Sequence, residues 1–436
     1  MDLVLKLIYK NNVYKTNFFS RLWKVFIYMY LLFPFKLTPM RNLQVGVYYF
    51  CILLGDIYII YEHYKNQILR RNLFDLFLFW CVFIFMIFLS ISIPFFYKTN
   101  DYSFFSHISS YVIRLACMSV FIINCNNIDN FFENYSKATS LYVLFTFILL
   151  IPPVRIMYMD IVSTPEVSDG IKSAGLMYYT RYGLQGFSGF EHTIKCSIGV
   201  TFSIYEFHIS KTLTQKRLFT ILSVLNFIGC CLYGRAGIVV SIVVIIFFFI
   251  RDIFVKKKYS LLFYIGLLFL FIYVIFLLLL DEIEQIPFLK WMFEPFIALV
   301  KTGSFHADSN DGLKTMYFKP SFDTIFSGDG IYTVEGSYYK KTDSGYLRPL
   351  LFWGIWGCLM YYLAFFILLI PIARELKKRN FQSLIYLLVI MNLFYEIKGE
   401  TNLIFITILY AINILLLSNR RQRINIIKNT KRVLLR

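Results

Sequence analysis

SLLFYIGLLFLFIYVIFLLLL, at residues 260–280, is the stretch that decides the fold class of this chain. Its residues are almost all apolar and show no alternation of period two, so it predicts a helix in lipid and not a strand of a membrane barrel. A helix of this length, rising about 1.5 Å per residue, crosses the roughly 30 Å hydrocarbon core of a bilayer. Comparable runs recur almost from end to end of the 436 residues, of which 58% are hydrophobic. We therefore expect an all-α polytopic membrane protein.

The apolar runs predict about twelve transmembrane helices. The first is the weakest, because Pro34, Lys36 and Pro39 interrupt it, and a re-entrant or interfacial helix is the alternative there. The expected spans are 22–37, 43–61, 73–96, 107–125, 138–154, 192–209, 217–233, 236–254, 260–280, 346–373, 381–397 and 402–418.

Lysine and arginine residues gather at alternate ends of these spans, which places both termini in the cytoplasm. Two long connections then lie outside, at 155–191 and 281–345, and loops of that length are usually functional. The expected order is a cytoplasmic N-terminus (1–21), five helices (22–154), the first long loop (155–191), four helices (192–280), the second long loop (281–345), three helices (346–418) and a basic cytoplasmic tail (419–436).

The charges and cysteines argue against several classes of protein. The net charge of +18 follows helix ends, which is typical of a membrane protein and not of a nucleic-acid binder. The eight cysteines lie in or beside apolar runs and show no zinc spacing, and neither long loop contains one. The N-terminus lacks a signal-peptide cleavage pattern, and the chain lacks GxxxxGK[ST], HExxH and a GxSxG triad motif. We expect no metal and no cofactor.

Charged residues near the outer edge of the membrane are the first functional candidates, because such positions are costly. Arg235 lies in LYGRAGIVV (232–240), a turn between two helices, where its guanidinium could hold phosphate bidentately. The alternative is an arginine that snorkels to the interface. Arg181, Glu191 and His192 belong to RYGLQGFSGFEH (181–192), whose glycines allow close approach of a ligand. Lys195 follows Glu191 by one helical turn, so the two could simply neutralise each other.

A third cluster is TDSGYLRPLLFWGIWG (342–357), which leads from the second loop into a helix. Asp343 is expected either to cap that helix or to act in catalysis, while Tyr346 and Arg348 sit at interface depth. Arg155 and Lys319, in the two long loops, are further candidates for binding substrate.

Other charged residues favour structural roles. Arg114 and Asp56 lie within spans and could form a buried pair that orders the bundle. Glu396, Lys398 and Glu400 crowd a short external turn, which predicts a solvated hairpin rather than a site.

The three stretches 181–192, 233–237 and 343–357, in this order and with two long loops, resemble the integral-membrane O-antigen polymerase and ligase families. Ligases tend to carry a histidine where Asp343 stands, so the resemblance favours a Wzy-type polymerase. The Arg-to-Gly loop pattern of some polymerases has here only a lysine version, Lys319 followed by Gly330.

The resemblance implies an inverting, metal-independent glycosyltransferase of the bacterial inner membrane, with its active site facing the periplasm. The donor would be a glycan on undecaprenyl pyrophosphate and the acceptor a second lipid-linked repeat unit, with a chain-length regulator as a candidate partner and no role for nucleic acid. Arg235 first, and Arg181 or Arg348 second, would stabilise the leaving diphosphate. Asp343, or Glu191 and His192 behind it, would take the hydroxyl proton. Arg348, Tyr346, Lys195, Arg155 and Lys319 would bind substrate.

Two other functions remain open at this stage. A lipid-linked oligosaccharide flippase is also a basic protein with many spans, but it needs a charged interior and short loops. An O-antigen ligase is the nearest rival enzyme.

Overall fold

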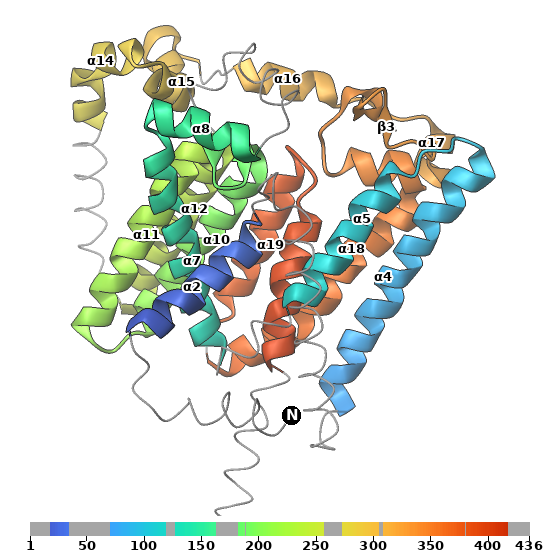
Figure 1. Ribbon diagram of the computed structural model, residues 1–436, viewed down its shortest axis with the longest axis horizontal. Coiled ribbons are helices and arrows are strands. Elements are labelled where there is room, and N and C mark those ends of the chain that lie inside the picture. Colours follow the sequence, from blue (N-terminus) through green and yellow to red (C-terminus); the bar gives the residue numbers. More distant parts are fainter. Residues whose placement is uncertain are drawn as a thin grey trace, which may run out of the picture.

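The computed structural model (Figure 1) is an all-α bundle with a cover of short elements at one end. It describes residues 18–34, 70–118, 127–162, 182–187, 189–256, 273–304, 308–379 and 381–416. The long helices of the bundle are α2 (Phe18–Leu32), α4 (Arg70–Tyr97), α5 (Ser103–Met118), α7 (Ile128–Leu149), α10 (Gly189–Ile209), α11 (Leu213–Tyr233), α12 (Arg235–Lys256), α18 (Leu347–Lys378), α19 (Ser383–Glu396) and a helix over Asn402–Leu416.

Four of the described helices are long and apolar enough to cross a membrane, namely α4, α11, α12 and α18. Their outward faces suit lipid. On α4, Phe88 and Phe96 are more than half exposed, while Phe79 and Phe83 are buried against the bundle. Large exposed apolar side chains on one face of a helix are costly in water and neutral in hydrocarbon. The prediction of a helical membrane protein is therefore confirmed at this level.

The bounds of several helices differ from the spans expected from the sequence. The helix expected at 138–154 begins earlier, at Ile128, because Phe131, Phe132 and Tyr135 bury a face of its polar first half. After α7 the chain bends by 113° into α8 (Pro152–Val162), a broken span or a re-entrant element where a loop was expected. Helix α2 has 15 residues and is too short to cross a bilayer by itself. The span expected at 43–61, and most of 260–280, lie outside the described residues.

Both long loops contribute structure at the same end of the bundle, uppermost in Figure 1. The first contributes most of α8 and a hairpin of β1 (Tyr182–Gly183) and β2 (Gly186–Phe187). The second contributes most of α14 (Leu280–Gln285), then α15 (Pro287–Thr302), α16 (Asp308–Met316), α17 (Phe322–Ser327), a hairpin of β3 (Thr333–Val334) and β4 (Ser337–Tyr338), and the 3-10 turn η3 (Tyr339–Lys341).

A single carboxylate fastens the second hairpin to the bundle. Asp101, in the turn between α4 and α5, accepts hydrogen bonds from the backbone N–H of Ser103 at 3.0 Å, of Tyr332 at 2.5 Å and of Thr333 at 2.8 Å. Thr99 adds a bond from its hydroxyl to the carbonyl of Gly330, at 2.8 Å. The long second loop is therefore held against the α4–α5 turn.

Helix α18 is broken at Gly354, which has a φ of 69° and a ψ of −171°. The break frees the carbonyls of Leu351 and Phe352, which accept the N–H groups of Asp329 and Gly330. Gly328 faces Gly354 so closely that a Cβ on Gly354 would lie 2.8 Å from the nitrogen of Gly328. Only glycine tolerates both this backbone conformation and this contact. The first turns of α18 are thereby joined to the second loop.

We predict that Gly354→Ala destabilises the protein by about 2–3 kcal/mol, because the new Cβ would meet backbone atoms and the residue would keep a left-handed φ. The measurement is the thermal unfolding midpoint of the purified full chain in detergent. Gly312→Ala is the matched control, since a Cβ there meets nothing within 4 Å. Equal midpoints for the two variants would contradict the close packing of Gly354.

Asp101 gives a prediction about pH. Burial by itself would raise the pKa of Asp101, but the hydrogen bonds from Ser103, Thr333 and Tyr332 outweigh it and hold that pKa below its ordinary value of 3.8. A depressed folded-state pKa stabilises the protein above the ordinary value, and the contribution is lost as pH falls through the lowered value. Asp101→Asn should therefore cost roughly 1 kcal/mol at pH 7 and nothing once the wild-type carboxyl is protonated. The test is the thermal unfolding midpoint of wild type and of Asp101→Asn, measured at pH 7 and at a pH where the wild-type carboxyl is protonated. A difference between the two proteins that is the same at both pH values would refute the prediction.

Candidate functional site

A cavity of about 330 Å³ opens at the loop-side end of the bundle. Three of the sequence-predicted residues, Glu191, Asp343 and Arg348, line it together. They come from the first turn of α10, the segment before α18 and the first turn of α18. Tyr233, Gly234 and Ala236 of the third quoted motif also line the cavity, so the fold brings all three motifs to one place. The other lining residues are His107, Tyr111, Phe190, Tyr233, Gly234, Ala236, Tyr338, Lys398, Gly399, Glu400 and Ile404.

The turn 397–401 was expected to be a solvated hairpin, and that expectation is wrong. Glu396 is fully buried, and only 2% of the Glu400 side chain is exposed. Glu396 accepts hydrogen bonds from the N–H groups of Thr401 and Asn402 at the start of the last described helix. It therefore caps that helix from the preceding one and fixes the turn that carries Lys398 and Glu400 into the cavity wall.

Arg348 lies between two tyrosine rings and beside Glu400. Its guanidinium carbon is 4.4 Å from the centroid of the Tyr332 ring and 3.6 Å from that of Tyr338. The guanidinium lies 3.5 Å from the Glu400 carboxylate and donates to the Tyr332 hydroxyl, which in turn donates to Glu400 at 2.7 Å. His107 Nε2 lies 3.8 Å from the same carboxylate. Arg348 is thus a buried cation held in one orientation at the cavity wall.

Asp343 does not cap α18. That helix begins at Leu347, and its capping residue, Tyr346, makes no side-chain capping bond. Asp343 lines the cavity and is partly exposed, and its carboxylate accepts no hydrogen bond from any residue that the structure describes. It is therefore open to a ligand, unlike Glu400.

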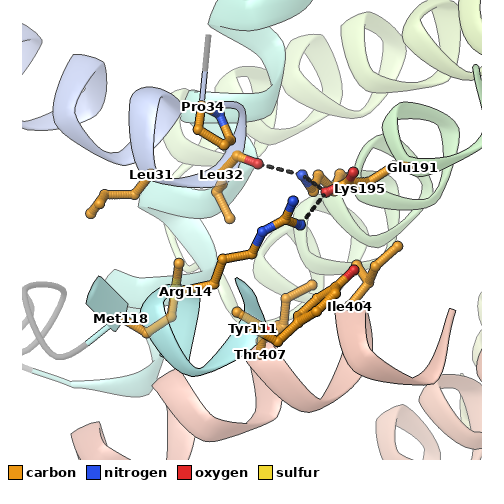
Figure 2. A pocket seen from close by; sticks show the side chains of 11 residues that line it. Leu31, Leu32, Pro34, Tyr111, Arg114, Met118, Glu191, Lys195, Ile404 and Thr407 are labelled. Atoms are coloured by element: carbon orange, nitrogen blue, oxygen red, sulfur yellow. Dashed lines mark hydrogen bonds and ion pairs between the residues drawn. The ribbon is translucent and has the colours of Figure 1, made fainter. Parts of the chain in front are cut away.

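Below the cavity, Glu191 connects to a second, smaller hollow (Figure 2). Glu191 Oε1 pairs with Lys195 Nζ at 2.5 Å and with Arg114 at 3.0 Å. Lys195 also donates to the carbonyl of Leu32 at the end of α2. The expectation that Glu191 and Lys195 neutralise each other is confirmed. Arg114 contributes to the same cluster, while Asp56 lies outside the described residues.

Arg235 faces away from the cavity. Its neighbours Gly234 and Ala236 line the wall, but its own side chain forms an ion pair with Glu294 of α15 and lies 5.1 Å from the ring of Trp291. Its partner comes from the second loop, and no signal in the LYGRAGIVV stretch could have revealed it.

His192 is fully buried behind the wall. Its Nε2 lies 2.6 Å from the Tyr142 hydroxyl, and the rings of Phe33 and Tyr233 pack edge-on against it. The hydroxyl of Tyr142 also accepts the N–H of Gln185. In this position His192 supports the first hairpin rather than facing the cavity.

The remaining candidates lie around the cavity or beyond it. Arg155 is buried, 5.6 Å from the ring of Tyr182. Tyr346 donates to the carbonyl of Leu393 at 2.6 Å, which braces the start of α18. Lys319 is exposed and is not part of the cavity wall, and Arg181 lies outside the described residues.

Comparison with known proteins gives no identification. No family model matches the chain, and no curated protein matches it.

We predict that Glu191→Gln destabilises the protein by about 3 kcal/mol, because it leaves two cations at the bundle interior without their carboxylate. The double variant Glu191→Gln/Lys195→Met should recover part of the loss, since it removes one of the two cations. Thermal unfolding of the purified chain measures both, and Glu335→Gln, on an exposed turn, is the control for the same substitution. Glu191→Gln as stable as wild type would refute the role of the cluster.

Proposed function

We propose that this protein polymerises a lipid-linked glycan, as a Wzy-type polymerase of a bacterial inner membrane. The proposal includes about twelve spans with both termini in the cytoplasm, so that the cavity and the two long loops face the periplasm. It is supported by the position of the cavity, at the end of a membrane bundle and beneath loop segments, where the headgroups of lipid-linked sugars would lie.

The observation that carries the proposal is a carboxylate open to a ligand in the same cavity as a fixed guanidinium. Asp343 and Arg348 both line it, and Arg348 is held by Glu400 and two tyrosine rings. The acceptor hydroxyl gives its proton to Asp343 as its oxygen attacks the donor anomeric carbon. The bond from that carbon to the diphosphate oxygen breaks, and the diphosphate leaves with the electron pair.

Arg348 is the cation best placed to stabilise the departing diphosphate. A preorganised, desolvated guanidinium is more effective there than a mobile surface charge, because it needs no reorganisation as charge develops. This changes the order expected from sequence, in which Arg235 came first, since Arg348 lines the cavity whereas the side chain of Arg235 pairs with Glu294 outside the cavity lining. Lys398, also at the wall, adds positive charge.

The tyrosines suit the proposed sugar substrate. Tyr111, Tyr233 and Tyr338 line the cavity. Such side chains combine an apolar surface with a hydrogen-bonding end, which matches the alternating C–H and O–H faces of a pyranose.

We predict that Asp343→Asn lowers the polymerisation rate by roughly 100-fold or more, because it removes the proton acceptor and keeps the shape. The assay is the purified full chain in detergent with synthetic lipid-linked repeat units, and chain length is read on a gel. Asp323→Asn, an exposed aspartate of the same loop, is the matched control and should leave the rate unchanged.

Wild-type activity in Asp343→Asn would remove Asp343 from the mechanism. Two further outcomes would replace the proposal. Transfer of polymer to a lipid A core acceptor would identify a ligase, and translocation of labelled lipid-linked units across vesicles without elongation would identify a flippase.

A further inference from the structure

We infer that Glu400 is a positioning residue that sets the orientation of Arg348 and fastens the β3–β4 hairpin over the cavity. The effect of Glu400 on catalysis through Arg348 rests on the proposed function, whereas its effect on the docking of the hairpin does not.

The backbone around Glu400 is held in place by contacts that do not involve its side chain. The N–H groups of Lys398 and Gly399 both bond to the carbonyl of Tyr395, and Glu396 accepts the N–H groups of Thr401 and Asn402, which follow Glu400. A Cβ on Gly399 would meet the ring of Phe190 at 2.9 Å, so the turn is packed closely against α10. The turn has little freedom to follow a ligand.

The carboxylate of Glu400 joins three separate parts of the chain. It accepts the hydroxyl of Tyr332 from the second loop at 2.7 Å and that of Tyr361 from α18 at 3.2 Å. It also pairs with Arg348 and lies near His107 of α5. With 2% of its side chain exposed and these bonds made, Glu400 is not available as a base for a substrate hydroxyl. Its role is exerted through its partners.

Without the Glu400 carboxylate, Arg348 would be a buried cation that has lost its counter-ion. The guanidinium is buried, and its Nε has no hydrogen-bond partner among the described residues, so the Glu400 charge is the main compensation for its own. A buried arginine that loses its counter-ion moves toward water or binds an anion less selectively. The Tyr332 and Tyr338 rings would lose their central cation at the same time, and the hairpin would lose a major contact with α18.

The test is a double-mutant cycle with Glu400→Gln and Arg348→Gln on the full chain. Glutamine removes the charge and keeps one acceptor oxygen, so it can retain one of the two tyrosine bonds, which reach different oxygens of Glu400. We expect Glu400→Gln to slow polymerisation about 10-fold and Arg348→Gln about 100-fold. Because Glu400 acts through Arg348, the double variant should be no slower than Arg348→Gln alone.

A second readout needs no substrate. Lys340 and Lys341 follow the hairpin directly and are exposed, so trypsin cleavage there reports whether the hairpin is docked. We expect several-fold faster cleavage in Glu400→Gln and in Arg348→Gln, with no further increase in the double variant. Glu335→Gln, the same change at an exposed position of the hairpin, should be cleaved at the wild-type rate.

If Glu400→Gln does not fold, Tyr338→Leu tests the same idea at a partly exposed position, and it should speed cleavage and slow polymerisation. Additive effects of Glu400→Gln and Arg348→Gln, or a wild-type result for Glu400→Gln or Tyr338→Leu, would overturn the inference. If the wild type makes no polymer, the proposed function fails, and the cleavage cycle still decides the role of Glu400.

Discussion

A charge that leaves water must find a partner, and this constraint organises the loop-side end of the bundle. Glu400 meets Arg348 and two tyrosine hydroxyls, while Glu191 meets Lys195 and Arg114. Each group draws together helices that are far apart in sequence. Asp343 departs from this rule among the described residues of the cavity wall, because its carboxylate accepts no hydrogen bond there. A site that must bind a substrate needs such an unfilled position.

The glycine contact between Gly328 and Gly354 has a complementary effect. It interrupts α18 near its start and lets main-chain groups of the second loop bond to main-chain groups of the helix. Side-chain contacts on a long loop are easily rearranged, whereas a backbone junction without room for a Cβ is not. The loop is thus built into the bundle on one side, and the cavity has a firm wall where Arg348 begins its helix.

The sequence predicted the class of fold because hydrophobic excess and run length are local properties. It also selected Glu191, Asp343 and Arg348, because charged residues at the outer ends of apolar runs are few and costly. It missed Glu400 because a short turn with two acids and a lysine is typical of a solvated hairpin. The partners that bury Glu400 are distant in sequence, such as Tyr332, 68 residues upstream. Arg235 was ranked first for the converse reason, since its partner Glu294 lies 59 residues away. Local patterns identify candidates, and long-range partners decide between them.

The bond from Lys195 to the carbonyl of Leu32 has a consequence for biogenesis. The two residues are 163 positions apart, and the short helix α2 ends at Leu32, beside the Lys195 ammonium group. During synthesis α2 leaves the ribosome long before α10, so the end of α2 has to enter the membrane region with that last carbonyl still hydrated or otherwise bonded. The Lys195 ammonium group can accept this role only once α10 has been inserted, so the Leu32 carbonyl gains its hydrogen-bond donor at that point. Helix α2 is therefore synthesised before α10 and gains this bond only afterwards.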